Sequence, residues 1–142
     1  MDERLLEIRE YKGEGYKPLI DYGDWRVAIL RPNHGAQSAD IDSVERHNRT
    51  DEVFVLLNGF GVLFIGDGEK RLERLYPQLM EQGKLYNIKR SAWHTIFLSP
   101  NSNVLIIENR DTGVENTDFF SLQPEHKEMI IHTAKAEQAK WQ

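Results

Sequence analysis

The chain has 142 residues, no cysteine and a formal net charge of −5, with its basic residues scattered along it. The absence of cysteine excludes disulfides, thiolate metal ligands and cysteine nucleophiles. The negative charge argues against a nucleic-acid partner, because non-specific binding depends on neutralising phosphates. No segment approaches the ~20 apolar residues of a membrane span and no apolar leader is visible, so we expect one soluble, cytoplasmic domain over residues 1–142 with no membrane partner.

The chain divides into short β-rich segments separated by turn signals. Residues 1–10 are ambiguous between a short helix and an added edge strand. Residues 16–22 and 25–31 predict a hairpin, and residues 32–43, rich in turn-forming side chains, predict a loop. Such a pattern favours an all-β sandwich or barrel over an α/β layout. Further strands are predicted over residues 44–48, 52–57, 60–65, 71–75, 84–89, 93–98 and 104–109.

The pattern changes after residue 120, where a helix over about 124–140 is predicted. Pro124 suits the first turn of a helix, and Glu125 and Glu128 lie near its positive end. Apolar residues from Met129 onward give this helix a partly apolar stripe. We interpret it as a packing or dimerisation element rather than a catalytic one.

Four residues combine into a candidate metal site: Glu45, His47, Glu52 and His94. Glu45 and His47 are two residues apart, so both side chains leave the same face of an extended strand. Glu52 begins one apolar strand and His94 lies in another. Two imidazoles and two carboxylates that converge on one cavity would suit a divalent ion such as manganese, iron, zinc or nickel.

The first part of this pattern resembles the first motif of the cupin superfamily. That motif reads Gly, five residues, His-x-His, three or four residues, Glu, six residues, Gly. His47, Glu52 and Gly59 match it with the correct spacing, whereas Glu45 replaces the first His and Ala39 the first Gly.

The second cupin motif reads Gly, five residues, Pro-x-Gly, two residues, His, three residues, Asn. Gly83 and His94 match it, whereas Lys89, Ser91 and Leu98 stand in place of Pro, Gly and Asn. The resemblance implies a cupin-type β-barrel or jelly roll with its core at about residues 25–110, followed by the C-terminal helix. It implies no single function, because this fold hosts isomerases, dioxygenases, lyases, decarboxylases and metal-free binding modules.

Two functions from different classes fit these residues. The first is a metal-dependent enzyme acting on a small polar metabolite, in which the metal is a Lewis acid and Glu45 or Glu108 is the general base. Within this class, the strand that contains His94, followed by residues 108–111, is similar to the corresponding part of ureidoglycolate lyases, which are also cupins. The second is a small-molecule-binding or sensor cupin without catalysis, because replacement of the usual His by Glu45 equally fits a cupin that has lost its metal. Other polar residues that strand parity could place in the cavity are Arg26, Tyr86, Glu108, Asn109 and Arg110.

Trp93, Thr95 and Phe97 have the parity opposite to His94, so they are expected to point away from the cavity. The two aromatic residues among them are too large to leave in water, and contiguous exposed apolar patches usually mark an interface. Cupins commonly form dimers through such faces, so the resemblance implies a homodimer. The competing account is that residues 5–30 fold back and cover this face within one chain.

Overall fold

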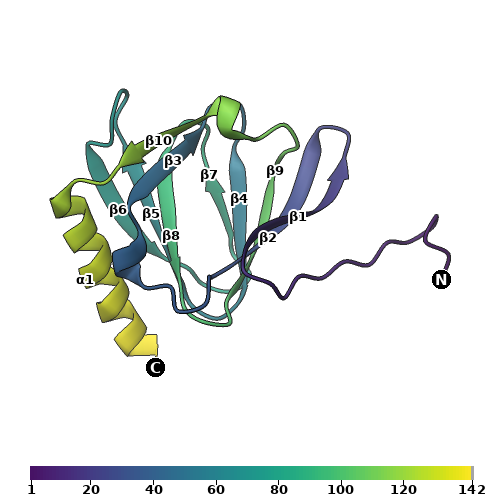
Figure 1. The fold of residues 1–142 in the computed structure, drawn as a ribbon, viewed down its shortest axis with the longest axis horizontal. Coiled ribbons are helices and arrows are strands. Elements are labelled where there is room, and N and C mark those ends of the chain that lie inside the picture. The colour runs from purple at the N-terminus through teal and green to yellow at the C-terminus, as the bar shows by residue number, and fades with distance from the viewer. Residues whose placement is uncertain (142) are drawn as a thin grey trace.

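Two five-stranded antiparallel sheets lie face to face in this protein, whose computed structural model describes residues 1–141 (Figure 1). The first sheet consists, in spatial order, of β1 (Gly15–Tyr22), β2 (Trp25–Arg31), β9 (Asn103–Asn109), β4 (Glu52–Asn58) and β7 (Leu85–Ile88). The second sheet consists, in spatial order, of β10 (Thr117–Ser121), β3 (Ser43–His47), β8 (Trp93–Leu98), β5 (Gly61–Asp67) and β6 (Arg74–Leu79). Helix α1, Pro124–Trp141, lies outside the second sheet, and two short 3-10 helices, η1 (Ser38–Asp40) and η2 (Val114–Asn116), interrupt the loops.

The prediction of an all-β jelly roll followed by a C-terminal helix is confirmed. Within residues 1–141 no strand of one sheet pairs with a strand of the other, so the strands form a sandwich rather than a closed, continuously hydrogen-bonded barrel. None of the helices in this part of the chain combines the length and the apolar character needed to cross a membrane.

Most predicted strands lie within one or two residues of their observed positions, but three regions differ from the prediction. The strand expected over 71–75 begins only at Arg74, because a tight turn occupies the preceding residues and the Glu73 N–H donates to the Asp67 carbonyl at 2.9 Å. Strand β10 was not predicted, since it is short and pairs with β3, far away in the sequence. Residues 1–14 form neither the helix nor the edge strand considered for the first ten residues.

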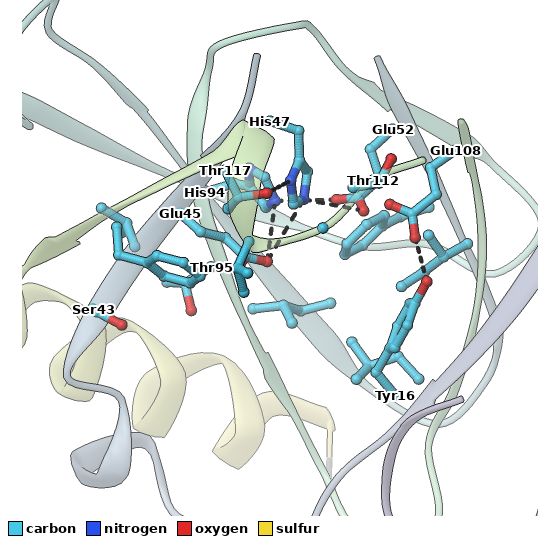
Figure 2. A pocket seen from close by; sticks show the side chains of 18 residues that line it. Tyr16, Ser43, Glu45, His47, Glu52, His94, Thr95, Glu108, Thr112 and Thr117 are labelled. Carbon is cyan, nitrogen blue, oxygen red and sulfur yellow. Dashed lines mark hydrogen bonds and ion pairs between the residues drawn. The ribbon is translucent and has the colours of Figure 1, made fainter. Parts of the chain in front are cut away.

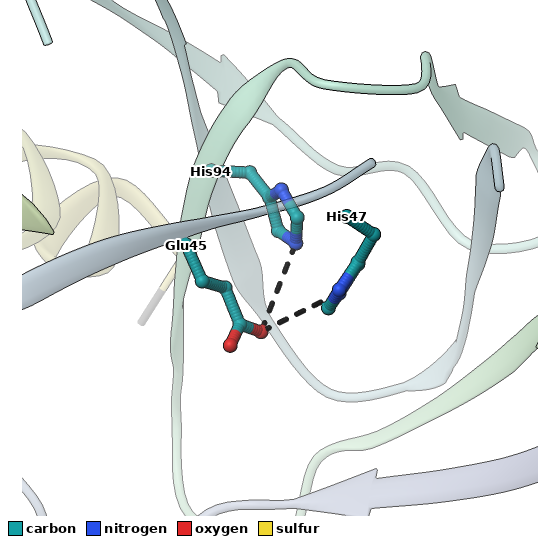
Figure 3. A group of neighbouring side chains, drawn as sticks. All are labelled: Glu45, His47 and His94. Atoms are coloured by element: carbon teal, nitrogen blue, oxygen red, sulfur yellow. Dashed lines mark ion pairs between the residues drawn. The ribbon is translucent and has the colours of Figure 1, made fainter. Parts of the chain in front are cut away.

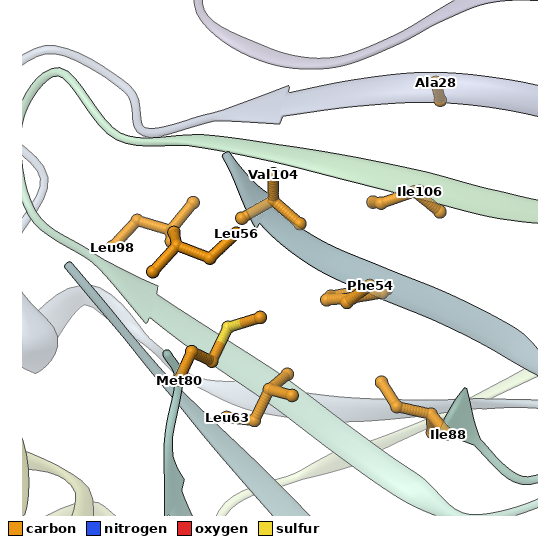
Figure 4. Close-up of a cluster of buried hydrophobic side chains, with 9 residues drawn as sticks. All are labelled: Ala28, Phe54, Leu56, Leu63, Met80, Ile88, Leu98, Val104 and Ile106. Atoms are coloured by element: carbon orange, nitrogen blue, oxygen red, sulfur yellow. The ribbon is translucent and has the colours of Figure 1, made fainter. Parts of the chain in front are cut away.

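The main core fills the space between the two sheets. Its buried apolar side chains come from the inward-facing positions of both sheets, as strand alternation requires. They are Ala28, Phe54, Leu56, Leu63, Met80, Ile88, Leu98, Val104 and Ile106 (Figure 4). At about 25 cal/mol per Å² of buried apolar area, a cluster of this kind is the largest favourable contribution to folding.

A second apolar layer lies between the second sheet and α1. Ile130 and Ala134 of the helix are buried against Phe97 and its neighbours on β5. Trp93 is buried with Phe120 and other residues near β10. The face carrying Trp93 and Phe97 is therefore buried within one chain, Phe97 against α1 and Trp93 among neighbouring side chains that include Phe120, and residues 5–30 do not contribute to either cluster.

The homodimer stays a prediction, but Trp93 and Phe97 are not the reason for it, because both side chains are already buried within one chain. The first sheet has no helix over its outer face in Figure 1. Trp25, Leu57 and Leu85 are exposed on strands of this sheet. The first sheet therefore exposes more large apolar side chains than the second, and it is the better candidate for a contact between two copies.

Three of the four glycine positions of the two cupin motifs, all but Ala39, have an unusual backbone conformation in common. Gly59, Gly83 and Ser91 have φ values of 88°, 82° and 66°. Glycine adopts this left-handed region without steric cost. Gly59 is also required for space, because a Cβ there would lie 2.3 Å from the Ser102 hydroxyl oxygen. Ser91 keeps the conformation of the glycine that it replaces, and its N–H donates to the His47 carbonyl at 2.8 Å, so it links β3 to the start of β8.

Candidate metal centre

The four predicted ligands line one cavity between the sheets, with a volume of about 540 Å³ (Figure 2). Glu45 and His47 come from β3 and His94 from β8, all in the second sheet, whereas Glu52 comes from β4 in the first. Glu45 and His94 are the paired positions of β3 and β8, so the sheet register places them side by side. His47, Glu52 and His94 are each less than 9% exposed.

Each of the two imidazoles lies close to both the Glu45 and the Glu52 carboxylates. His94 Nε2 lies 3.1 Å from Glu52 Oε1, and His47 Nε2 lies 3.4 Å from Glu52 Oε2. Glu45 Oε1 is 3.7 Å from His47 Nε2 and 3.8 Å from His94 Nε2 (Figure 3). Ligand atoms ~2.1 Å from a common ion lie roughly 3.0–3.4 Å from one another. The contacts of Glu52 with the two histidines, one through each carboxylate oxygen, are within this range, and those of Glu45 are a few tenths of an ångström longer.

Hydrogen bonds at the far side of each imidazole direct its Nε2 atom toward the cavity. His94 Nδ1 lies 3.0 Å from the Ala92 carbonyl, which can only accept, so Nδ1 carries a proton. His47 Nδ1 lies 2.9 Å from the Thr117 hydroxyl oxygen. Both contacts orient the ring with Nε2 toward the cavity, and the one to the Ala92 carbonyl also selects the His94 tautomer that leaves Nε2 free for a metal.

Three buried polar atoms at this point have no hydrogen-bond partner among the described residues 1–141: His47 Nε2, His94 Nε2 and Glu52 Oε1. An imidazole lone pair facing a carboxylate oxygen is repulsive unless a proton or a cation lies between them. Buried polar groups without partners are also costly. A divalent cation would satisfy all three atoms at once, so the residues present fit a metal ion.

Glu108 lies at the inner side of the same cavity and extends the cluster. It is 5% exposed, and its carboxylate accepts a hydrogen bond from the Tyr16 hydroxyl. Ligand atoms of His47, Glu52 and Glu108 lie within 4.8 Å of one another, as do those of Glu45, His47 and His94. The cavity therefore contains two overlapping groups of ligands that share His47.

Burial and neighbouring charges shift the pKa values of these residues in opposite directions. Burial, with the Glu52 carboxylate beside it, raises the pKa of Glu108 to about 7. Burial also disfavours the charged form of Glu52, but its contacts with His47 and His94 outweigh burial and hold the Glu52 pKa well below the usual range. For His47, burial opposes protonation, yet the nearby Glu52 carboxylate raises the pKa overall. Without a metal, the cluster thus binds protons in the place of a cation.

The other polar residues considered from the sequence behave differently. Of the five residues that parity could place in the cavity, only Glu108 lines it. Arg26 instead forms an ion pair with Asp21 at 2.9 Å, and Arg110 lies 3.8 Å from the same aspartate. Thr95, expected to point away, does line the cavity, since β3 and β8 pair at only one position and the sheet opens beside it.

Sequence reasoning missed two residues of the site, Tyr16 and Thr117. Tyr16 belongs to β1 and reaches Glu108, which is 92 positions away in the chain. Thr117 belongs to β10 and is paired with His47 in the sheet register. In both cases the missing information is which strands pair, and no local signal in the sequence carries it.

Comparisons with known proteins identify the fold. Neither the family models nor the curated proteins give a match to this chain. Among solved structures, the nucleoside dehydratase Pac13 matches 82% of this chain and 87% of its own, with a TM-score of 0.52 and 11% identity. The capsular polysaccharide assembling protein CapF from Staphylococcus aureus matches 80% of this chain with a TM-score of 0.52 and 18% identity.

The chain spans about a third of CapF, covering 31% of its length. A cupin-2 domain protein from Shewanella frigidimarina matches 71% of this chain and 85% of its own, with a TM-score of 0.48 and 18% identity. The two-sheet architecture, the positions of the two motifs in it and the likeness to solved structures together show that the chain has the cupin fold.

Proposed function

We propose that the protein is a metal-dependent enzyme that acts on a small metabolite bound in the cavity between the sheets. The observation that carries this proposal is the set of buried Nε2 and carboxylate atoms without hydrogen-bond partners within residues 1–141, aimed at one point. A purely structural histidine normally has both ring nitrogens satisfied. These two have only Nδ1 satisfied.

In this proposal His47, His94, Glu52 and Glu45 hold the ion. Two nitrogen and two oxygen donors form a harder set than three histidines and one glutamate, which favours manganese or ferrous iron, although raw affinity still favours zinc or nickel over either. The bound ion would supply Lewis-acid stabilisation of negative charge that develops on a substrate oxygen. Glu45 is the most exposed of the four, with 41% of its side chain accessible, so it is the ligand that can yield its position to substrate.

Glu108 is the group that we assign to proton transfer. Burial raises the pKa of Glu108, to about 7 in the metal-free cavity, so its carboxyl group can hold a proton that a general acid would donate. Tyr16 donates a hydrogen bond to one Glu108 oxygen and fixes the orientation of the carboxyl group. Glu45 is the weaker candidate for this role, because its side chain is much more exposed than that of Glu108.

Metal content decides the first step of this proposal. The untagged protein, purified from cultures supplemented separately with manganese, iron, zinc or nickel, is analysed by elemental mass spectrometry. About one equivalent of one metal is expected, because the ligands are buried and preformed. A matched control is His132→Ala, which removes an exposed histidine of α1 and should leave the metal content unchanged.

The alternative is a metal-free binding cupin, and one observation favours it. Glu45 stands where the motif has histidine, and its carboxylate is the ligand group farthest from the other three. Such a protein would hold a small molecule in the same cavity and use the cluster only for hydrogen bonding. Less than about a tenth of an equivalent of metal under every supplement would support this function over the enzyme.

A further inference from the structure

Apart from the two histidines, the ionisable side chains that line the cavity are all acidic. Glu45, Glu52 and Glu108 contribute three carboxylates, and no lysine or arginine of the described residues lines the cavity. Arg26, in register with Glu108 across β2 and β9, is held by Asp21 at 2.9 Å. Arg46 forms an ion pair with Asp118 and lies over the Trp93 ring, outside the cavity.

This charge distribution is unsuited to an anionic substrate. Sites for carboxylates or phosphates normally offer an arginine fork, a lysine or a helix N-terminus, because a buried anion without a partner is costly. Here a divalent ion would be balanced or outnumbered by carboxylates before any substrate enters. A second anionic group on the substrate would then face carboxylates rather than a cation.

The remaining walls show what the site can hold. Leu30, Phe54, Ile96 and Ile106 form apolar wall on strands of both sheets, whereas hydroxyl groups are spread round the cavity on Ser43, Thr95, Thr112 and Thr117 (Figure 2). Val114 and Phe119 also line the cavity and are 78% and 58% exposed, so they form its mouth. The volume of about 540 Å³ is typical of a small-molecule site.

Resting on the proposed function, we infer that the substrate is an uncharged small molecule that presents two neighbouring oxygens to the metal and an apolar or ring-shaped body to the walls. A diol or a hydroxyketone has this chemistry. The two oxygens would take the place of water or of Glu45 beside the other ligands, and the body would lie against Phe54 and Ile106. Glu108 is then on the side of the cavity from which it can exchange a proton with a hydroxyl group of the ligand.

A matched pair of probes tests the charge preference. 2-Hydroxyacetophenone is a neutral hydroxyketone, and mandelate is a hydroxy acid of nearly the same size and shape that carries a carboxylate. Both are titrated into the metal-loaded protein in a calorimeter at neutral pH. We expect the hydroxyketone to bind at least about 10-fold more tightly, because like charges placed together at a binding site strongly oppose binding. In free solution the carboxylate is the better metal ligand, so a reversed order in the protein reports on the cavity.

A charge introduced at the mouth tests the cause. Val114→Lys places an ammonium group at an exposed position of the cavity rim and should raise mandelate affinity about 10-fold with unchanged metal content. Leu85→Lys is the control, since Leu85 is 74% exposed on a strand of the first sheet and lies outside the cavity. It should change neither affinity.

The outcomes separate this inference from the proposed function. Absence of bound metal contradicts the proposed function itself. With metal present, mandelate binding as tightly as the hydroxyketone, or no binding of either probe, overturns the inference about the substrate. No gain for Val114→Lys also overturns it, since the carboxylates would then not be the reason that anions are excluded.

Discussion

The space between the two sheets has two ends that differ in almost every respect. At one end apolar side chains are packed together, and at the other there is a hollow into which carboxylates and imidazoles project beside an apolar wall. The same strands build both ends, since three of them carry an ionisable residue at one end and, four positions along on the same face, an apolar one at the other. These pairs are Glu52 and Leu56 on β4, His94 and Leu98 on β8, and Glu108 and Val104 on β9.

The difference shows how one scaffold separates stability from chemistry. The apolar end lowers the free energy of the folded state through burial and close packing. The polar end does the opposite, because it buries ionisable groups that lack hydrogen-bond partners within residues 1–141. A cation or a substrate is the natural compensation for that cost, and the two ends should therefore respond to mutation in opposite ways.

The largest effect is expected when an imidazole is removed from the polar end. His47→Ala and His94→Ala should each lower metal affinity by more than the 10–100-fold that loss of an outer-shell partner typically causes. The metal-free variants should still fold but unfold at a lower urea concentration than the metal-free parent, because Glu52 loses one of the two imidazoles whose contacts offset its burial. Unchanged metal content in both variants, measured by elemental analysis, contradicts the ligand assignment.

The converse effect is expected at the apolar end of the same strand. Leu56→Ala should lower the free energy of unfolding by about 2–5 kcal/mol, because it leaves a cavity in a closely packed core. Metal affinity of the folded protein should stay within about threefold of the parent. Leu57→Ala is the matched control. Leu57 is the next residue along the strand, lies on the opposite face and is 49% exposed, so its replacement should lower the free energy of unfolding far less. A large loss of metal affinity in Leu56→Ala would show that the two ends are coupled.

The alternation that creates the two ends could be predicted from the sequence. Glu52 begins an apolar strand, and the two-residue spacing of Glu45 and His47 places them on one face, so the four candidate ligands were identified before the fold. The cupin resemblance supplied the position of His94. Ser91 shows that the pattern survives substitution, because its backbone still has the positive φ that the glycine of the motif provides.

The pairing of the strands could not be predicted from the sequence. Tyr16 reaches Glu108 only because β1 pairs with β2 and β2 with β9. The C-terminal helix was predicted, but not that it covers the face of Phe97. Both facts depend on contacts between distant parts of the chain, for which local propensity and periodicity carry no information.

A third expected effect is a pH dependence that belongs to the polar end alone. The pKa of Glu108 is raised to about 7 and that of His47 is also raised, so at pH values between about 4.5 and 7 the folded metal-free protein binds more protons than the unfolded chain. Its free energy of unfolding should therefore fall as pH rises through this range, by on the order of 1–3 kcal/mol. Below about pH 4.5 the lowered pKa of Glu52 acts in the opposite sense, and stability should fall as pH decreases.

Two variants and added metal check this pH dependence. Glu108→Gln should flatten the slope between about pH 4.5 and 7, whereas Leu56→Ala should shift the whole curve downward without changing its shape. Metal should reverse the slope, because the ligands bind it in their deprotonated forms. Urea denaturation at a series of pH values gives all four curves. A Glu108→Gln curve as steep as that of the parent would assign the slope to groups outside the cavity.

The smallest effect on metal affinity is expected at Thr117, which contacts the ligand His47 through a hydrogen bond. Its hydroxyl oxygen lies 2.9 Å from His47 Nδ1, and this contact helps to hold the ring with Nε2 toward the cavity. Thr117→Val keeps the shape and the β-branched character of the side chain but removes this contact, so metal affinity should fall about 10-fold, at the lower end of the range for outer-shell partners. Stability of the metal-free protein should change by less than about 1 kcal/mol, because Thr117 is only half-buried and lies near the end of β10. Thr117→Ser is the matched control, since it retains the hydroxyl group and should keep most of the affinity. Competition titration against a chelator measures all three proteins, and equal affinity for Thr117→Val and the parent would mean that the backbone alone holds His47 in position.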